Sequence, residues 1–350
     1  MDMGVTIKDV ANLAKVAPST VSRVIANSSR ISEKTKQRVR LAMKELGYHP
    51  NIIARSLANQ STQAIGVVMP SSADKVFQNP FFPEVIRGIS TGAHEKKHAI
   101  YMSTGETEEE IFQEVVQMVQ GRRVDGIVLL YSKVDDMILP YLQEHEVPCV
   151  VIGKPFKNGE GVSFVDNDNF RAGREATEYL IEMGHERIAF VGGNLDLVVT
   201  IDRLTGYDKA IRGANLQYCD EYVIHQEFLR EGGKEAVRKL MSLEERPTAL
   251  VVADDLMALG ILNTLDEMEI SVPDDISIVS FNNALIAELA RPALTSVDIN
   301  IFELGYQAVR CLIDQFEYPY QMVKQIKVPH EMIKRQSCKP LTKKTADTTS

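Results

Sequence analysis

Residues 16–25 read Val16-Ala17-Pro18-Ser19-Thr20-Val21-Ser22-Arg23-Val24-Ile25, and these residues decide how the amino-terminal part of the chain folds. Val21, Val24 and Ile25 recur at helical spacing, which predicts a short helix with one apolar face. Pro18 suits the first helical position, where its missing N–H would have no partner. The opposite face carries Ser19, Thr20, Ser22 and Arg23. Taken alone, the pattern is more typical of a solvated amphipathic helix than of a helix that offers hydroxyls and a guanidinium to a DNA major groove.

The neighbouring sequence favours the second interpretation. Thr6 can cap a first helix, Ile7 to about Ala14, whose apolar residues follow the i, i+3, i+4, i+7 rule. Ser32 can cap a third helix, Glu33–Leu46, which Gly47 is well placed to end. Because a tight turn joins the first two helices, residues 1–49 are predicted to form an all-α helix-turn-helix domain.

Charge is distributed unevenly along the chain. The 350 residues have a formal net charge of −9, with 39 Lys and Arg against 48 Asp and Glu. Within residues 1–60, however, ten basic residues face only four acids, so this segment is near +6. A compact basic head on an acidic body indicates a polyanionic partner for the head alone.

A short helix-prone segment follows the head. Residues 51–59 have a possible cap in Asn51, and a polar stretch comes after them. Isolated helices shorter than roughly 12–15 residues are marginal in water. We therefore predict that residues 50–62 form a hinge helix and linker that fold only against DNA and a second copy of the chain.

From residue 63 to 338, apolar strands alternate with amphipathic helices, which predicts an α/β core of two doubly wound subdomains with a cleft between them. The strand candidates are Ile65–Met69, Ala99–Ser103, Gly126–Leu130, Cys149–Ile152, Ile188–Val191, Tyr222–Ile224, Ala249–Val252 and Ile276–Ser280. The helix candidates include Pro83–Lys97, Glu108–Gln120, Phe170–Met183, Arg203–Gly213, Gly232–Ser242 and Leu256–Met268. The segment Gly161–Asp168 is predicted to cross between the subdomains, and residues 339–350 are predicted to be a disordered tail.

Several classes of protein are disfavoured. No apolar run approaches the roughly 20 residues that span a bilayer, and residues 1–4 lack the pattern of a secretory signal, so we expect a cytoplasmic protein without a membrane partner. The four cysteines are scattered and contain no CxxC pair, which favours reduced thiols over a metal site. No phosphate loop, dinucleotide fingerprint or HExxH motif occurs, so we expect no catalytic residues and no cofactor.

Polar residues follow the predicted strands, where ligands bind to doubly wound sheets. Asp254-Asp255 and Asp166-Asn167-Asp168 are acidic clusters at such positions, and without a nearby base or nucleophile they favour hydroxyl recognition over catalysis. Arg203 is predicted to open a helix and to bracket a polyol opposite Asp166 and Asp254, although a surface ion pair fits its spacing equally well.

Aromatic and amide side chains complete the candidate cleft. Phe81 and Phe82 could stack on the apolar face of a sugar, although a Phe pair more often packs in a core. Asn282, after another strand, offers an amide instead of a charge.

The chain resembles the lac repressor (LacI/GalR) family of bacterial transcription regulators over residues 4–338. The segments that carry the resemblance are Thr6–Ala11, Thr20–Val24, Leu46–Asn51, Ala54–Leu57, Asn79–Phe82, Gly184–Ile188, Arg203–Tyr207 and Ala253–Gly260. The resemblance implies a three-helix head, a hinge helix and a core like that of periplasmic sugar-binding proteins. It also implies a homodimer, or a dimer of dimers, that binds a pseudo-palindromic DNA operator.

The resemblance also implies the residues of two sites. We expect DNA contacts from Thr6, Pro18, Ser19, Thr20, Ser22, Arg23, Asn27, Arg30, Tyr48, Asn51, Ala54, Arg55 and Leu57. Arg23 can bind a guanine through two hydrogen bonds, and Leu57 can act as an apolar wedge at the central minor-groove step. We expect effector contacts from Phe81, Phe82, Asp166, Arg203, Asp254 and Asn282.

The chain departs from the family pattern at three places. Ala17 replaces a frequent Ser and so removes a helix cap worth typically about 1 kcal/mol. Pro18 and Ser19 offer no long base-reading side chain, and Asn282-Asn283 replaces the Asp of many sugar-responsive relatives. Residues 281–283 and 295–300 look most like those of maltose-operon repressors of Gram-positive bacteria.

Our hypothesis is a dimeric repressor whose operator affinity is controlled by a small sugar, maltose or a maltodextrin, bound between the core subdomains. A purine-responsive repressor, and a global catabolite regulator with a phosphorylated carrier protein as corepressor, remain alternatives. A sugar transport receptor would share the core but would need a signal peptide and no basic head, whereas an enzyme would need a nucleophile or a cofactor loop.

Overall fold

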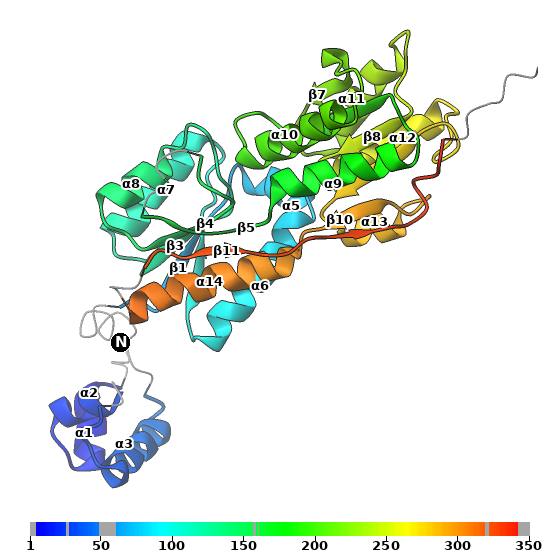
Figure 1. Ribbon diagram of the computed structural model, residues 1–350. Helices are drawn as coiled ribbons and strands as arrows, with labels where there is room; N and C mark the ends of the chain where they lie inside the picture. Colours follow the sequence, from blue (N-terminus) through cyan, green and yellow to red (C-terminus); the bar gives the residue numbers. More distant parts are fainter. Residues whose placement is uncertain are drawn as a thin grey trace, which may run out of the picture.

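The computed structural model describes residues 5–25, 28–48, 61–156, 159, 161–318 and 322–341 of the chain. These residues form a helical head and an α/β core of two lobes (Figure 1). The predicted fold class, an all-α helix-turn-helix head with a core of two doubly wound subdomains, is confirmed. The predicted hinge helix lies outside the described residues.

The head consists of α1 (Ile7–Ala14), α2 (Pro18–Ile25) and α3 (Glu33–Leu46), with the bounds that the sequence predicts. At the start of α1, the backbone N–H and the hydroxyl of Thr6 both donate to the Asp9 carboxylate, at 2.8 and 2.6 Å. Gly47 ends α3 with a left-handed φ of 63°. The residues buried between the three helices are Val10, Ala11, Ala14, Val21, Val24, Val39 and Ala42.

The first lobe of the core, the N-lobe, is built on a parallel sheet. Its strands, in spatial order, are β11 (Gln325–Lys327), β5 (Ser163–Asp166), β4 (Cys149–Ile152), β3 (Gly126–Leu129), β1 (Ala64–Val68) and β2 (Ala99–Met102). Its helices are α5 (Ala73–Gln78), α6 (Phe81–Glu95), α7 (Glu108–Gln120), α8 (Ile138–Glu144) and α14 (Ile301–Glu317). Helices cover both faces, which is why its central strands are apolar at every position.

The second lobe, the C-lobe, repeats this plan with one antiparallel edge strand. Its strands, in spatial order, are β12 (Glu331–Ile333), β10 (Thr295–Asp298), β9 (Ser277–Phe281), β8 (Ala249–Val252), β6 (Ile188–Gly192) and β7 (Val223–His225). Its helices are α9 (Asn169–Glu182), α10 (Val198–Gly213), α11 (Arg230–Met241), α12 (Asp255–Glu267) and α13 (Leu285–Leu289), with a 3₁₀ turn at Asp220–Tyr222.

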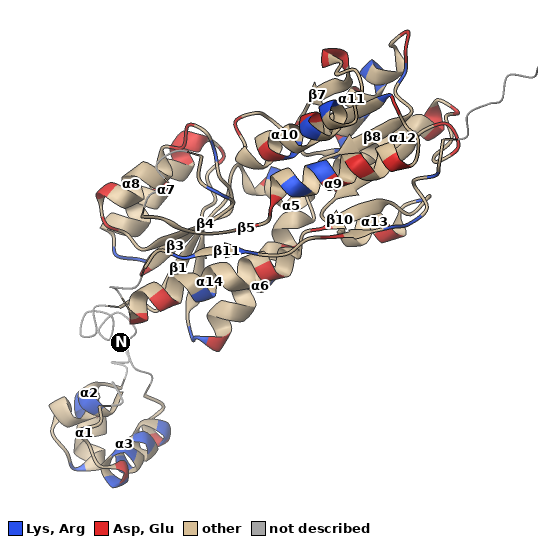
Figure 2. Ribbon diagram, in the orientation of Figure 1, with Lys and Arg blue, Asp and Glu red and all other residues tan. Residues whose placement is uncertain are grey.

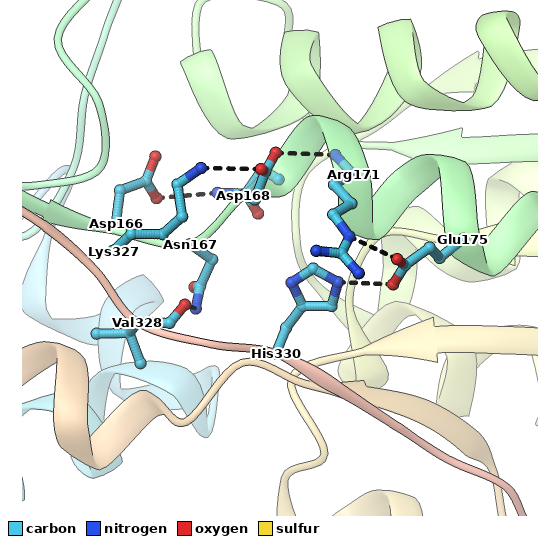
Figure 3. A network of polar contacts seen from close by, with 9 residues as sticks. Asp166, Asn167, Asp168, Arg171, Glu175, Lys327, Val328 and His330 are labelled. Atoms are coloured by element: carbon cyan, nitrogen blue, oxygen red, sulfur yellow. Dashed lines mark hydrogen bonds and ion pairs between the residues drawn. The ribbon is translucent and has the colours of Figure 1, made fainter.

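The chain passes between the lobes three times: from β5 to α9, from β10 to α14, and from β11 to β12. The side-chain amide of Asn167 in the first crossing ties all three together, because its Nδ2 donates to the carbonyl oxygens of Ile299 and Val328, both at 3.0 Å. Beside it, Lys327 pairs with Asp168 at 2.9 Å and His330 contacts Glu175 at 3.0 Å (Figure 3). Asn167 is only 6% exposed, so it forms a buried pin at the point where the lobes join.

The structure corrects several sequence-based expectations. Residues 161–168 are not a crossover throughout, because Ser163–Asp166 pairs with β4 and β11 as β5 and the crossing begins only afterwards. Arg203 does not open its helix; α10 begins at Val198, which is buried, and Arg203 lies in its second turn. Residues 339–341 are also ordered against the core, where Lys339 N–H donates to Ser277 and Leu341 N–H donates to Met183. Residues 342–350 lie outside the described part.

We expect Asn167→Leu to destabilise the core by about 2 kcal/mol or more, because it leaves two buried carbonyl groups without a donor, each costing roughly 1–3 kcal/mol. Urea unfolding followed by circular dichroism measures the effect. Asn263→Leu, an exposed substitution on α12, is the matched control. A loss for Asn167→Leu no larger than that of the control would contradict the pin.

Candidate functional site

The polar face of α2 lies outside the core of the head. Pro18, Ser19, Ser22 and Arg23 are exposed and Thr20 is half-buried, whereas Val21 and Val24 of the same helix are buried. Basic residues occur on α2 and are frequent along α3, where the ribbon is blue (Figure 2). An exposed helix that carries hydroxyls and a guanidinium has the chemistry for reading base edges and contacting phosphates.

The remaining expected DNA contacts fall into two groups. Arg30 is exposed, Tyr48 is half-buried against the core of the head, and the hydroxyl of Thr6 is engaged by Asp9. Asn27, Asn51, Ala54, Arg55 and Leu57 lie outside the described residues.

A cavity of about 380 Å³ separates the two lobes. It opens at the carboxyl ends of the strands, and all six residues predicted for the effector contribute to its lining: Phe81, Phe82, Asp166, Arg203, Asp254 and Asn282. Phe81 and Phe82 meet edge to face with ring centres 5.1 Å apart, and both are half-buried at the start of α6. The cavity therefore combines charged, amide and aromatic side chains, the mixture that fixes a polar ligand with an apolar face.

Arg203 is the buried cation of this cleft, with 4% of its surface exposed. Its Nε donates to Asn169 Oδ1 at 3.0 Å and its Nη1 donates to the carbonyl oxygen of Ala253 at 2.7 Å. The guanidinium also lies 4.3 Å from the centre of the Phe281 ring. Burial lowers the pKa of Arg203 to about 10, while the nearby acids, Asp254 foremost, oppose that shift. The group is therefore charged at neutral pH, and its Nη2 takes part in neither hydrogen bond.

Asp254 is held by four hydrogen bonds. Its Oδ1 accepts from the backbone N–H groups of Leu256 and Met257, at 2.7 and 3.2 Å, and so caps α12. Its Oδ2 accepts from the side-chain amides of Asn282, at 2.8 Å, and Asn79, at 2.9 Å. Burial raises the pKa of Asp254, although these donors oppose the shift. Asp254 thus organises the amides that border the cavity.

Asp166 forms the opposite wall, on the N-lobe. Its Oδ2 accepts from the backbone N–H of Lys154 at 3.0 Å, and its Oδ1 accepts from Asn169 Nδ2 at 2.9 Å. Since Asn169 also accepts from Arg203, one amide connects the acid of the N-lobe with the cation of the C-lobe. Burial raises the pKa of Asp166 to about 6.

The acidic clusters seen in the sequence do not act as units. Asp255 is buried behind the cleft, where it accepts from Ser280 at 2.5 Å and Ser296 at 2.8 Å, and burial raises its pKa to about 7. Asp168 caps α9 and pairs with Lys327. Of the four acids in the two clusters, Asp166 and Asp254 line the cavity, whereas Asp168 and Asp255 do not.

Sequence reasoning missed two asparagines that complete the site. Asn79, 4% exposed, reaches from the N-lobe to Asp254 and to the carbonyl oxygen of Phe228 in the C-lobe, at 3.1 Å. Asn169 links Asp166 to Arg203. Asn79 begins the Asn79–Phe82 motif and Asn169 directly follows Asp168, so their positions in the sequence were the available signal.

Contacts between the lobes border the mouth of the cleft. Lys75 pairs with Glu227 at 2.8 Å, Val134 N–H donates to the carbonyl oxygen of Asp196 at 2.8 Å, and Val198 N–H donates to that of Ser132 at 3.1 Å. The lobes are therefore joined beside the cavity as well as at the three crossings.

A basic helix-turn-helix head and a two-lobed core, whose cleft combines apolar, charged and amide side chains, together define a ligand-controlled DNA-binding protein. The model of bacterial regulatory proteins of the lacI family matches residues 6–51, and that of the periplasmic binding protein-like domain matches residues 177–338. The HTH-type transcriptional regulator MalR of Streptococcus pneumoniae is 43% identical over 318 residues, which are 89% of this chain and 92% of MalR. This chain belongs to the lacI family of bacterial regulatory proteins, whose members are transcriptional regulators.

Two solved structures extend the similarity to nearly the whole chain. The complex of the transcriptional regulator CelR with cellobiose has a TM-score of 0.75 and 33% identity, covering 95% of this chain and 99% of CelR. The lac repressor dimer bound to operator and the anti-inducer ONPF has a TM-score of 0.83 and 26% identity, covering 96% and 99%. Among the described residues, no helix is long and apolar enough to cross a membrane.

The raised pKa of Asp166 makes part of the stability of the fold depend on pH. A carboxyl whose pKa rises from 3.8 to about 6 on folding contributes stability that is present below 3.8 and lost as the pH rises through 6. Asp166→Asn cannot titrate, so we expect its midpoint of thermal unfolding to fall less between about pH 4 and pH 8 than that of the parent protein. Asp266→Asn, an exposed control on α12, should follow the parent. If the midpoints of thermal unfolding of Asp166→Asn and the parent changed equally with pH, the contribution of Asp166 to the pH dependence would be contradicted.

Proposed function

We propose that this protein is a homodimeric transcriptional repressor that binds a pseudo-palindromic operator and is controlled by maltose or a maltodextrin in the cleft between its lobes. The observation that carries the proposal is the cleft itself. It holds a fixed guanidinium, two carboxylates, several amides and a pair of aromatic rings in a chain that also carries a basic DNA-reading head. Cellobiose, the ligand in the CelR complex, is likewise a disaccharide, and the similarity to MalR favours maltose.

The polar groups of the cleft suit hydroxyl recognition. A carboxylate and a forked cation on opposite walls can each form paired hydrogen bonds with neighbouring hydroxyls of a sugar ring. The Phe81–Phe82 pair supplies an apolar surface for the C–H face of such a ring. Asp254 is held by two amides and two backbone N–H groups, and this favours a binding role over acid–base catalysis. We therefore propose that the protein is no enzyme and acts in the cytoplasm, where its DNA lies.

Control of DNA binding requires that the sugar prefer one arrangement of the lobes. Shifting a two-state population from 99:1 to 1:99 takes about 5.5 kcal/mol of differential affinity, which two clefts in a dimer can supply at roughly half each. The exposed ion pair at the mouth and the buried pin at Asn167 are consistent with lobes that separate at the mouth and stay joined at the crossings.

We expect maltose to stabilise the full chain against thermal unfolding, by about 2.7 kcal/mol at one hundred times its dissociation constant. Arg203→Met should weaken the binding of maltose about tenfold or more, because hydrogen bonds to a charged group contribute roughly 1.5–3 kcal/mol. Arg212→Met, an exposed residue of the same helix paired with Asp208, is the matched control and should bind maltose like the parent.

Titration calorimetry with maltose, maltotriose and cellobiose measures these affinities. If a purine base stabilised the protein and none of the sugars did, the effector would be a purine and not a sugar. Operator binding that responds only to a phosphorylated carrier protein would instead support the catabolite regulator.

We expect Arg23→Ala to lower affinity for the operator about 5- to 150-fold and to relax the choice of base at one position of each half-site. Arg38→Ala, which removes an exposed charge from α3, should weaken specific and non-specific DNA binding by similar factors. Fluorescence anisotropy with operator and scrambled duplexes over a salt series measures both effects. If Arg23→Ala and Arg38→Ala lowered the ratio of operator affinity to scrambled-duplex affinity equally, base reading by α2 would be contradicted. An affinity of the parent protein for DNA that does not change with salt would contradict it as well.

A further inference from the structure

Asp125 holds the chain segment that leads into the core. It lies directly before β3, half-buried, at the amino end of the N-lobe sheet. Its Oδ2 accepts from the Ser61 hydroxyl at 2.7 Å and from the Gln63 N–H at 2.9 Å. Its Oδ1 accepts from the N–H and the hydroxyl of Thr62, at 2.6 and 2.9 Å. One carboxylate thus binds all three residues of the segment Ser61–Gln63, here called the linker.

The four hydrogen bonds fix the direction of the linker as well as its position. An ionised carboxylate has about four acceptor sites, so this set uses the capacity of Asp125. Gln63, the last of the bonded residues before β1, has a left-handed φ of 53°, a conformation that is unfavourable in a residue other than glycine. The backbone N–H of Asp125 also donates to the carbonyl oxygen of Ala64 at 2.8 Å. The linker and the first residue of β1 are therefore held from a single position.

The same two strands reach the cleft at their other ends. β1 and β3 pair in parallel, with Ile65 beside Gly126. Beyond their carboxyl ends, Pro70 and Ser71 follow β1 and Leu130 and Tyr131 follow β3, and all four contribute to the lining of the cavity. A hydrogen-bonded pair of strands thus connects the wall of the cleft to Asp125.

We propose that Asp125 is a positioning residue that fastens the linker to the N-lobe sheet, so that the linker moves with that sheet when the cleft is filled. The inference rests on the proposed function, because it assumes that the head reads DNA and that the cleft holds an effector. It assigns to Asp125 the task of setting operator affinity without contact with DNA or sugar.

The test uses the full chain and the duplex that the parent protein enriches from a random-sequence pool. Asp125→Asn keeps the shape of the side chain and one acceptor oxygen, but its amide NH₂ cannot accept from two of the four donors. We expect operator affinity to fall about tenfold, within the 5- to 150-fold range common for coupling between sites. Maltose affinity, measured by calorimetry, should stay within about twofold of the parent value, because the cleft is unchanged.

The direction in which Asp125→Asn changes operator affinity distinguishes a loss of linker positioning from a simple effect of the removed charge. Removing a negative charge from a DNA-binding protein raises its affinity for DNA through electrostatics alone. A decrease that keeps the salt dependence of the parent therefore reports lost positioning and not lost phosphate contacts. Glu144→Gln, which neutralises an exposed acid at the end of α8, is the matched control and should not weaken operator binding.

A second variant approaches the same contacts from the linker. The double substitution Ser61→Ala with Thr62→Val removes two of the four donors and leaves the core sequence intact, so it keeps the test open if Asp125→Asn unfolds. We expect it to lower operator affinity in the same direction by a smaller factor, about threefold to tenfold, and to add little to Asp125→Asn when the two are combined.

Operator affinity of folded Asp125→Asn equal to or above that of the parent would overturn the positioning role, and so would full additivity with the linker variant. A merely structural role would lower the unfolding midpoint and leave the affinity of the folded protein unchanged, which also overturns it. If the parent enriches no duplex at all, the proposed function fails instead, so the two failures are distinguishable.

Discussion

The burial of the Arg203 guanidinium is the constraint on which the rest of the cleft depends. A buried charge is tolerated only when it is compensated and hydrogen-bonded, and Arg203 meets this requirement with groups from several strand ends: the Asn169 amide, the Ala253 carbonyl oxygen and the face of Phe281. The acids that favour its charge in turn need donors, which the amides supply. The polar groups of the cleft are therefore connected to one another, and a change at one wall alters the electrostatic balance at the other.

The contacts between the lobes differ in how deeply they are buried, and this difference indicates how the lobes can move. The pin at Asn167 is buried and joins three chain segments, so breaking it would leave buried carbonyl groups without partners. The Lys75–Glu227 pair at the mouth is half-exposed, and such pairs are typically worth less than about 1 kcal/mol. Separation at the mouth about a fixed pin is thus the inexpensive motion. Asn79 lies between these extremes, because it is buried but spans the two lobes.

How far the sequence predicts this structure depends on whether the signal is local. The head helices were predicted to their bounds because caps and apolar spacing are local. The strands missed by the sequence analysis, β5 and β10–β12, are short and partly polar, and only pairing with distant strands makes them strands. The six cleft residues are predictable because the carboxyl ends of parallel strands converge. The position of Asn79 before Phe81 and Phe82 is a signal for its place near the cleft, but its contacts with the C-lobe arise only when the two lobes pack together.

The parallel sheet gives the N-lobe two functional edges. The strands β1, β3, β4 and β5 have their carboxyl ends at the cleft and their amino ends at the opposite edge, where the chain enters from the head. The five residues of β1 span roughly 17 Å at about 3.3 Å per residue, and close packing makes such a strand stiff. A displacement at Pro70 is therefore carried to Ala64 with little loss, provided that the linker is held to the sheet. Four hydrogen bonds to a single carboxylate meet that condition, because Ser61–Gln63 cannot shift without breaking them.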